Sequence, residues 1–128
     1  DLIAFNFIIG NCDAHLKNYS LMRSDDWCEL SLAPAYDLVS TTVYPELTTA
    51  MGLYVGEKKR LEAVERADFV ELGHSMGLSR RAAETRIDML RDRVVAAFEA
   101  QAADSADSEI ARAIARQSKK RIEKLAVV

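Results

Sequence analysis

The chain has 128 residues, of which 49% are hydrophobic and 29% charged, and its formal net charge at pH 7 is −3. This composition is ordinary for a single soluble domain or for one lobe of a larger one. The small negative charge predicts no general attraction to nucleic acid or anionic lipid, so any such contact would need a local basic patch.

Two further features bound the class of protein. The longest apolar stretch, residues 2–10, is about half the length that a membrane span requires, so we expect no membrane association. Cys12 and Cys28 lack C-x-x-C spacing, which favours reduced thiols in a cytoplasmic protein. The sequence begins without Met and inside an apolar pattern, and we interpret it as a piece of a longer chain.

The first half of the chain predicts one buried helix followed by loops and short strands. Apolar residues are too dense at the start for a helix with a single apolar face. The expected elements are a buried helix over 1–9 that ends near Gly10, a polar loop over 11–18, a hairpin over 19–32, a loop between Pro34 and Pro45, and a short strand within 47–55.

From residue 57 onward the composition shifts to helix formers, and we divide the chain there into the segments 1–56 and 57–128. Capping residues and apolar spacing predict three helices in the second segment. They are a helix over 69–76 with a capping box of Asp68 and Glu71 and a closing Gly77, a helix capped by Ser79 with the stripe Ala83, Ile87, Leu90, Val94 and Phe98, and, after a connector over 102–108, a helix over 109–126 with the stripe Ala111, Ala115, Ser118, Ile122 and Leu125.

The loop over 10–18 concentrates groups that carry chemistry. Asp13 and Asn18 are five residues apart, the separation of Asp and Asn in the protein-kinase catalytic loop H-R-D-x-x-x-x-N. In that pattern the Asp accepts the proton of the substrate hydroxyl and the Asn holds magnesium. A second, charged metal ligand is needed downstream, and Asp37 follows the predicted hairpin as the D-F-G aspartate does. The spacing therefore predicts a catalytic carboxylate beside two ligands of a magnesium ion.

Two motifs resemble those of the HipA family of kinases. Residues 10–18 read G-N-C-D-A-H-L-K-N and are similar to that family's G-x-x-D-x-H-x-K-N; residues 32–40 read L-A-P-A-Y-D-L-V-S and are similar to its L-x-P-x-Y-D-x-x-S. Residues 50–53 and 58–60 also look like the family's downstream stretch. The resemblance implies a mainly α fold, the helical C-terminal lobe of a protein-kinase-like structure with a small β-hairpin insert. Residues 1–56 would carry the catalytic loop and metal ligands, and residues 57–128 would be a helical subdomain.

The resemblance also implies roles and partners. Asp13 would be the catalytic base, Asn18 and Asp37 would bind magnesium, His15 would orient Asp13 or touch phosphate, and Lys17 would help neutralise the transferred phosphoryl group. The activity would be ATP-dependent phosphorylation of a protein Ser or Thr by a growth-regulating toxin, with aminoacyl-tRNA synthetases as one substrate class. A helix-turn-helix antitoxin that also binds operator DNA would be the partner. No glycine-rich phosphate loop occurs in the 128 residues, so the chain alone is expected to be inactive.

Other interpretations stay open. A lipid or small-molecule kinase could use the same D-x-H-x-x-N loop. The segment 69–90 resembles a helix-turn-helix, but residues 66–99 hold six basic and six acidic side chains, which leaves no positive surplus for DNA. His74 is expected to be a partly buried structural histidine. In the last helix six basic residues outnumber two acidic ones, and the first interpretation of this surplus is a solvated face. This helix and residues 58–60 are the best candidates for contact with DNA or an antitoxin.

Overall fold

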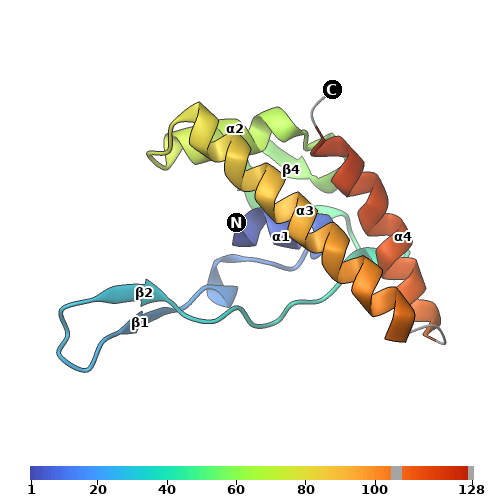
Figure 1. Ribbon diagram of the computed structural model, residues 1–128, viewed down its shortest axis with the longest axis horizontal. Helices are drawn as coiled ribbons and strands as arrows, with labels where there is room; N and C mark the ends of the chain where they lie inside the picture. The colour runs from blue at the N-terminus through green and yellow to red at the C-terminus, as the bar shows by residue number, and fades with distance from the viewer. Residues whose placement is uncertain (105–107, 127–128) are drawn as a thin grey trace.

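The computed structural model describes residues 1–104 and 108–126, and it is mainly helical, as predicted. Figure 1 shows the helices gathered on one side and a long hairpin projecting from the other. Short 3₁₀ turns lie at Leu16–Asn18, Thr41–Val43 and Leu61–Ala63. The helices and strands, in chain order, are α1 Leu2–Ile9, β1 Leu21–Arg23, β2 Leu30–Leu32, β3 Ala50–Val55, β4 Lys58–Arg60, α2 Arg66–Ser75, α3 Arg80–Asp104 and α4 Glu109–Lys124.

Helix α1 lies at the centre of the hydrophobic core, as its dense apolar sequence predicts. Phe7 and Ile8 are almost fully buried. The ring of Phe7 meets that of Phe69 from α2 edge to face, with centroids 5.2 Å apart. The helix ends at Gly10, which has a left-handed φ of 74° and donates its N–H to the carbonyls of Asn6 and Phe7. The loop that follows therefore leaves a rigid, buried helix.

The structure contains two antiparallel hairpins, where one was predicted as an insert. In the first, Leu21 pairs with Leu32 and Arg23 with Leu30. In the second, β4 pairs with β3 through an irregular register. The prediction missed β4, because its three basic residues follow the onset of helix-forming composition. The boundary proposed between 1–56 and 57–128 falls in the turn of this second hairpin, and the division itself stays a prediction.

Helix boundaries differ from the prediction at three places. α2 begins at Arg66, and its capping box consists of Glu65 and Asp68, so the predicted box of Asp68 and Glu71 is wrong. α3 continues to Asp104, so the start of the predicted connector 102–108 is helical, and residues 105–107 lie outside the described residues. α4 ends at Lys124, two residues before the predicted end at residue 126.

The caps predicted for the α2–α3 junction are confirmed. The Ser79 hydroxyl accepts the N–H of Ala82 at the start of α3, and Gly77 with φ of 91° follows the end of α2. His74 is exposed and not partly buried as predicted, although its Nδ1 lies 3.1 Å from the carbonyl of Leu78.

Ion pairs join the three C-terminal helices. Arg66 of α2 donates two hydrogen bonds to the Asp88 carboxylate of α3, at 2.8 and 3.0 Å, and a third to the Leu125 carbonyl at the end of α4. One guanidinium therefore fixes the three helices relative to one another.

Over residues 1–104 and 108–126, none of the helices combines the length and the apolar character that crossing a membrane requires.

Candidate active site

The loop that carries Asp13 is fixed against strand β3 through a glycine. The N–H of Gly52 donates to the Cys12 carbonyl at 2.7 Å. A Cβ added at Gly52 would lie 2.9 Å from both the Cβ and the backbone nitrogen of His15, so any other residue would push strand and loop apart. Gly52 therefore sets how closely the second hairpin approaches the loop.

The same loop is tied to the segment that carries Asp37. The Thr41 hydroxyl donates to the Gly10 carbonyl at 3.0 Å and accepts the N–H of Cys12 at 2.9 Å. The Tyr36 hydroxyl donates to the Lys17 carbonyl at 3.0 Å. Loop 10–18 and segment 36–42 therefore lie side by side although the hairpin separates them in sequence.

Asn18 and Asp37 are brought into direct contact. The Asn18 carboxamide nitrogen donates to a carboxylate oxygen of Asp37 at 2.5 Å. Asp37 has φ of 55°, a left-handed conformation that non-glycine residues seldom adopt and that often occurs at functional sites. The backbone therefore turns at Asp37 to direct its side chain toward Asn18.

The donor set of this pair fits a magnesium ion. The Asn18 Oδ1 atom is buried and has no hydrogen-bond partner within residues 1–104 and 108–126. Mg²⁺ prefers oxygen ligands, takes one or two carboxylates from the protein, and completes its shell with water and substrate phosphate. Groups of three or more His, Cys, Asp or Glu that could enclose a metal do not occur in the described residues of the chain.

The backbone of Asp13 is joined to this pair through the side chain of Asn11. Its side chain is exposed, and its N–H donates to the Asn11 Oδ1 atom at 3.1 Å. The Asn11 Nδ2 atom in turn donates to the Asp37 carbonyl at 3.1 Å. The structure thus brings the backbones of Asp13 and Asp37 to one side chain, and the catalytic role of each stays a prediction.

His15 and Lys17 occupy different positions around the loop. The His15 N–H donates to the Asp13 carbonyl at 2.9 Å, so the two residues are joined through the backbone. The His15 Nδ1 atom is buried and has no hydrogen-bond partner among the residues that the structure describes. Lys17 is exposed, and its ammonium group can reach solvent or a bound phosphate.

Several residues that shape the site carried no signal of their own in the sequence. Asn11, Tyr36, Thr41 and Gly52 make the contacts described above or below, yet polar residues scattered through helix and loop have no periodicity that would single them out. Tyr36 and Gly52 lie in stretches similar to a known family, which was the one available signal.

Arg121 of α4 supports the far side of the loop. Its Nε donates to the Ile8 carbonyl at 2.8 Å, near the end of α1. Burial lowers the pKa of this guanidinium from its ordinary value. Lys124 pairs with Glu65 at 2.8 Å and also donates to the Glu62 carbonyl. Two of the six basic residues predicted to form a solvated or DNA-binding face therefore brace the fold instead.

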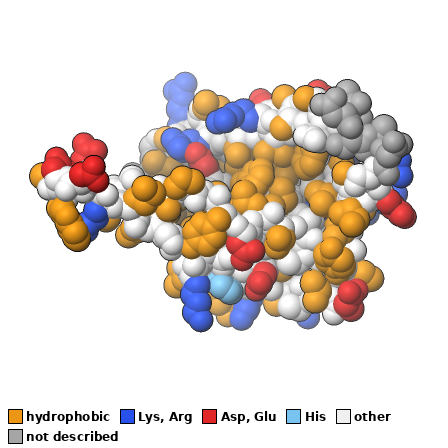
Figure 2. Space-filling view, turned by 90° about the horizontal axis from the view of Figure 1, so that it is seen from below, with side chains coloured by type: hydrophobic (Ala, Val, Ile, Leu, Met, Phe, Trp, Pro, Cys, Tyr) orange, Lys and Arg blue, Asp and Glu red, His pale blue; other side chains and the backbone are white. Residues whose placement is uncertain are grey.

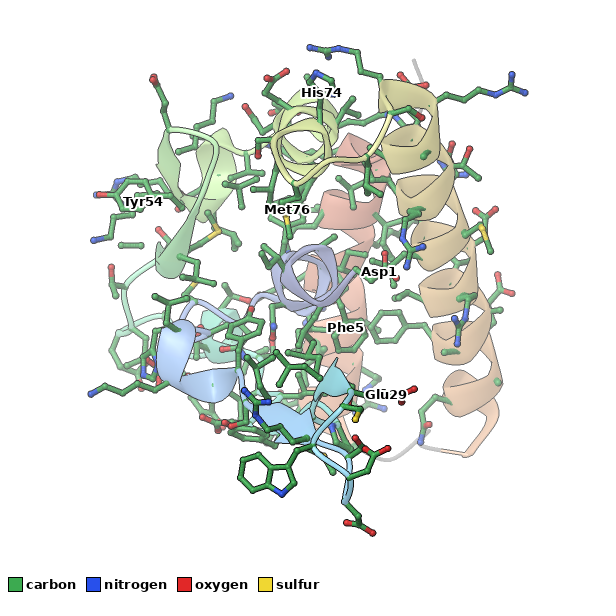
Figure 3. All side chains as sticks on the ribbon, turned by 90° about the vertical axis from the view of Figure 1, so that its left-hand side faces the viewer. Asp1, Phe5, Glu29, Tyr54, His74 and Met76 are labelled. Atoms are coloured by element: carbon green, nitrogen blue, oxygen red, sulfur yellow. The ribbon has the colours of Figure 1, made fainter. Side chains whose placement is uncertain are left out.

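Asp1 lines two apolar grooves of about 490 and 560 Å³. Figure 2 shows hydrophobic side chains gathered on one face of the molecule. Figure 3 shows Asp1 and Phe5 between α1 and α3, whereas Tyr54 lies at the outer edge of the second hairpin. The five predicted site residues line neither groove. The candidate site is thus a feature of the polar loops and is separate from these grooves.

Comparison with known proteins points to one family. The family model described as HipA-like C-terminal domain matches residues 1–98 of the chain. The protein named "Putative kinase Y4mE" of Sinorhizobium fredii is 31% identical over 107 residues, which cover 84% of this chain and 25% of that protein. A Haemophilus influenzae protein with the same kind of name is 28% identical over 102 residues, covering 61% of this chain and 26% of its own length.

A solved structure shares the fold. A chain in the complex of the Shewanella oneidensis MR-1 toxin–antitoxin system HipA, HipB and its operator DNA superposes with a TM-score of 0.74 over 97% of this chain and 29% of its own, at 21% sequence identity. This chain spans about a quarter of the length of the curated relatives. The match extends across the α2–α3 segment, which therefore belongs to the same fold.

Proposed function

The chain belongs to the family of HipA-like C-terminal domains, and from this premise we propose that it is the catalytic portion of an ATP-dependent kinase that phosphorylates a protein Ser or Thr. The observation that carries the proposal is the contact between Asn18 and Asp37. Asn18 lies five residues after Asp13, and Asp37 follows the hairpin of β1 and β2. Spacing and position after a hairpin suggested these three residues, and the Asn18–Asp37 contact supports the proposal because two ligands of one ion must lie close together.

Each residue has a distinct chemical role in the proposed reaction. The Asp13 carboxylate accepts the proton of the acceptor hydroxyl, whose oxygen forms a bond to the γ-phosphorus while the bond to the β–γ bridging oxygen breaks and ADP leaves. Asn18 and Asp37 hold a magnesium ion, which when bound supplies charge that offsets the charge on the transferred group. His15 orients Asp13 or contacts phosphate, and Lys17 helps to neutralise the phosphoryl oxygens.

The proposed biological setting is a growth-regulating toxin held by an antitoxin. Support comes from the similar fold in the complex of HipA with HipB and operator DNA. We propose a helix-turn-helix antitoxin as partner, with DNA contacted through it, and a component of translation, such as an aminoacyl-tRNA synthetase, as the substrate class. Since the 128 residues contain no glycine-rich phosphate loop, we propose that the chain alone is inactive.

The test uses a protein of the relatives' length that carries this chain. With labelled MgATP, Asp13→Ala should lower phosphate transfer by roughly two to four orders of magnitude, the usual contribution of a positioned acid–base group. Asp25→Ala is the matched control, because Asp25 is also an exposed carboxylate but lies in the turn between β1 and β2. Near-normal transfer by Asp13→Ala would remove the base role. Transfer to lipid or a small molecule, with none to protein, would change the acceptor class.

A further inference from the structure

Asn11 is a buried carboxamide that contacts both halves of the candidate site. The residue is only 4% exposed. Its Oδ1 atom accepts the N–H of Asp13 at 3.1 Å, and its Nδ2 atom donates to the Asp37 carbonyl at 3.1 Å and to the Asn6 Oδ1 atom at 2.9 Å. Both N–H groups and the oxygen thus each have a partner, which satisfies three of the four hydrogen bonds that a carboxamide can make.

We propose that Asn11 is a positioning residue, which sets the place of Asp13 relative to Asp37 through one planar carboxamide. The inference rests on the proposed kinase function. Because the carboxamide is rigid, neither partner can shift without moving or losing the other. Asp37 needs this support more than most residues, since its left-handed backbone directs its carbonyl toward Asn11 and its side chain toward Asn18.

The chemistry of the position favours Asn over every residue of similar size. Asp would keep an acceptor for the Asp13 N–H, but it has no hydrogen to donate to the Asp37 carbonyl or to Asn6. Its carboxylate would face two oxygens in a buried place, which is unfavourable. Leu has a similar shape and can neither donate nor accept. Asn11→Asp is therefore the isosteric change that removes the contact to Asp37 without removing volume.

Asn6 of α1 provides a matched control. It is buried to a similar degree, 6% exposed, and belongs to the same network, with Nδ2 donating to the Leu2 carbonyl at 3.1 Å and lying 3.5 Å from the Tyr19 hydroxyl. Its side-chain hydrogen bonds go to Leu2, Tyr19 and Asn11, so it reaches the two aspartates only through Asn11. Loss of the Asn6 side chain should therefore destabilise the fold without moving the two aspartates.

The experiment compares wild type, Asn11→Ala, Asn11→Asp and Asn6→Ala in the protein of the relatives' length, with folding of each checked by circular dichroism. Measured are kcat, KM for MgATP and the Mg²⁺ concentration for half-maximal rate. We expect both Asn11 variants to lose kcat by about 10- to 100-fold, the effect of small misplacements of catalytic groups. Both should also need several-fold more Mg²⁺, because Asp37 is no longer held. Asn6→Ala should keep kcat and the Mg²⁺ requirement close to wild type.

The outcomes separate this inference from the proposed function. A wild-type protein that transfers no phosphate refutes the proposed function and the positioning role with it. An active wild type whose Asn11 variants keep kcat and the Mg²⁺ requirement refutes the positioning role alone. Equal losses in Asn11→Asp and Asn6→Ala also overturn it, because they would show a general effect of the buried network. Where Asn11→Ala does not fold, the isosteric Asn11→Asp provides the comparison.

Discussion

Replacing Gly10 by Ala should destabilise the fold at the point where α1 ends and loop 10–18 begins. The residue has φ of 74°, which costs an alanine about 1–2 kcal/mol. A Cβ there would overlap the Thr42 hydroxyl and lie 2.8 Å from the Arg121 Nη2 atom. Overpacking of a buried place costs a further 1–3 kcal/mol or so, and the sum is about 2–5 kcal/mol.

Gly56→Ala separates the two causes. Gly56 has a similar φ of 60°, but a Cβ there would meet nothing within 4 Å. Only the backbone cost remains, and a stiffer unfolded chain offsets some of it, so we expect a loss of about 1 kcal/mol. Urea unfolding followed by far-ultraviolet circular dichroism is the suitable assay, because Trp27 is 72% exposed and reports on the hairpin. Equal losses in the two variants would refute the steric argument.

Three further predictions concern acid stability, DNA and nucleotide. Hydrogen bonds from Arg66 hold the pKa of the Asp88 carboxyl below its ordinary value. The pair therefore stabilises the fold at pH values above the unfolded-state pKa, and this contribution is lost as the pH falls through the lowered pKa. Asp88→Asn should lower Tm at neutral pH and make Tm fall less steeply in acid, and an unchanged dependence of Tm on pH would contradict this. The segment 69–90 should not bind DNA specifically, since Arg80 pairs with Glu71 and Arg86 with Asp1; a tight mobility shift that is lost in Arg80→Ala would prove this wrong. In calorimetry the chain alone should bind MgATP only weakly and turn none over, whereas turnover abolished by Asp37→Ala would show that it is a complete enzyme.

The helices could be predicted wherever one face is apolar and the caps are distinctive. α3 with its Ser79 cap follows from such a pattern. α1 has too many apolar residues for a single face and was predicted from their density and from its Gly10 cap. The start of α2 could not be chosen from sequence, because Glu65 with Asp68 and Asp68 with Glu71 both have the spacing of a capping box. The structure uses the first pair, and Asp68 then also pairs with Lys58 at 3.0 Å. This tertiary contact has no counterpart in a local pattern.

Strand β4 is a second element that local sequence patterns could not predict. Its residues Lys58, Lys59 and Arg60 have little preference for strands and none of the alternation of a half-buried one. Pairing with β3 holds them, and Lys59 lies over the ring of Tyr54 with its Nζ 5.4 Å from the centroid. Long-range pairing and a cation–π contact thus override local propensity.

The candidate site was predicted as far as spacing reaches. The five-residue step from Asp13 to Asn18 and the position of Asp37 after a hairpin suggested the residues, and the Asn18–Asp37 contact agrees with a shared site. The roles of all five predicted residues remain predictions. The contacts of Asn11 with Asp37 and of Tyr36 with Lys17 could not be inferred, because these partners lie 26 and 19 residues apart in sequence and become neighbours only in the folded chain.

The basic last helix illustrates why charge counts mislead when burial is unknown. Arg121 and Lys124 were counted toward a surface for DNA or an antitoxin, yet Arg121 holds the end of α1 and Lys124 holds the segment before α2. Removing the Arg121 charge would disturb the end of α1, and removing the Lys124 charge would disturb the segment 62–65. A resulting loss of activity or binding would be wrongly assigned to a partner surface. Arg116, Lys119 and Lys120 are exposed on the same helix. Substitutions at these three positions therefore test partner binding by charge, because they leave the supports of the loop in place.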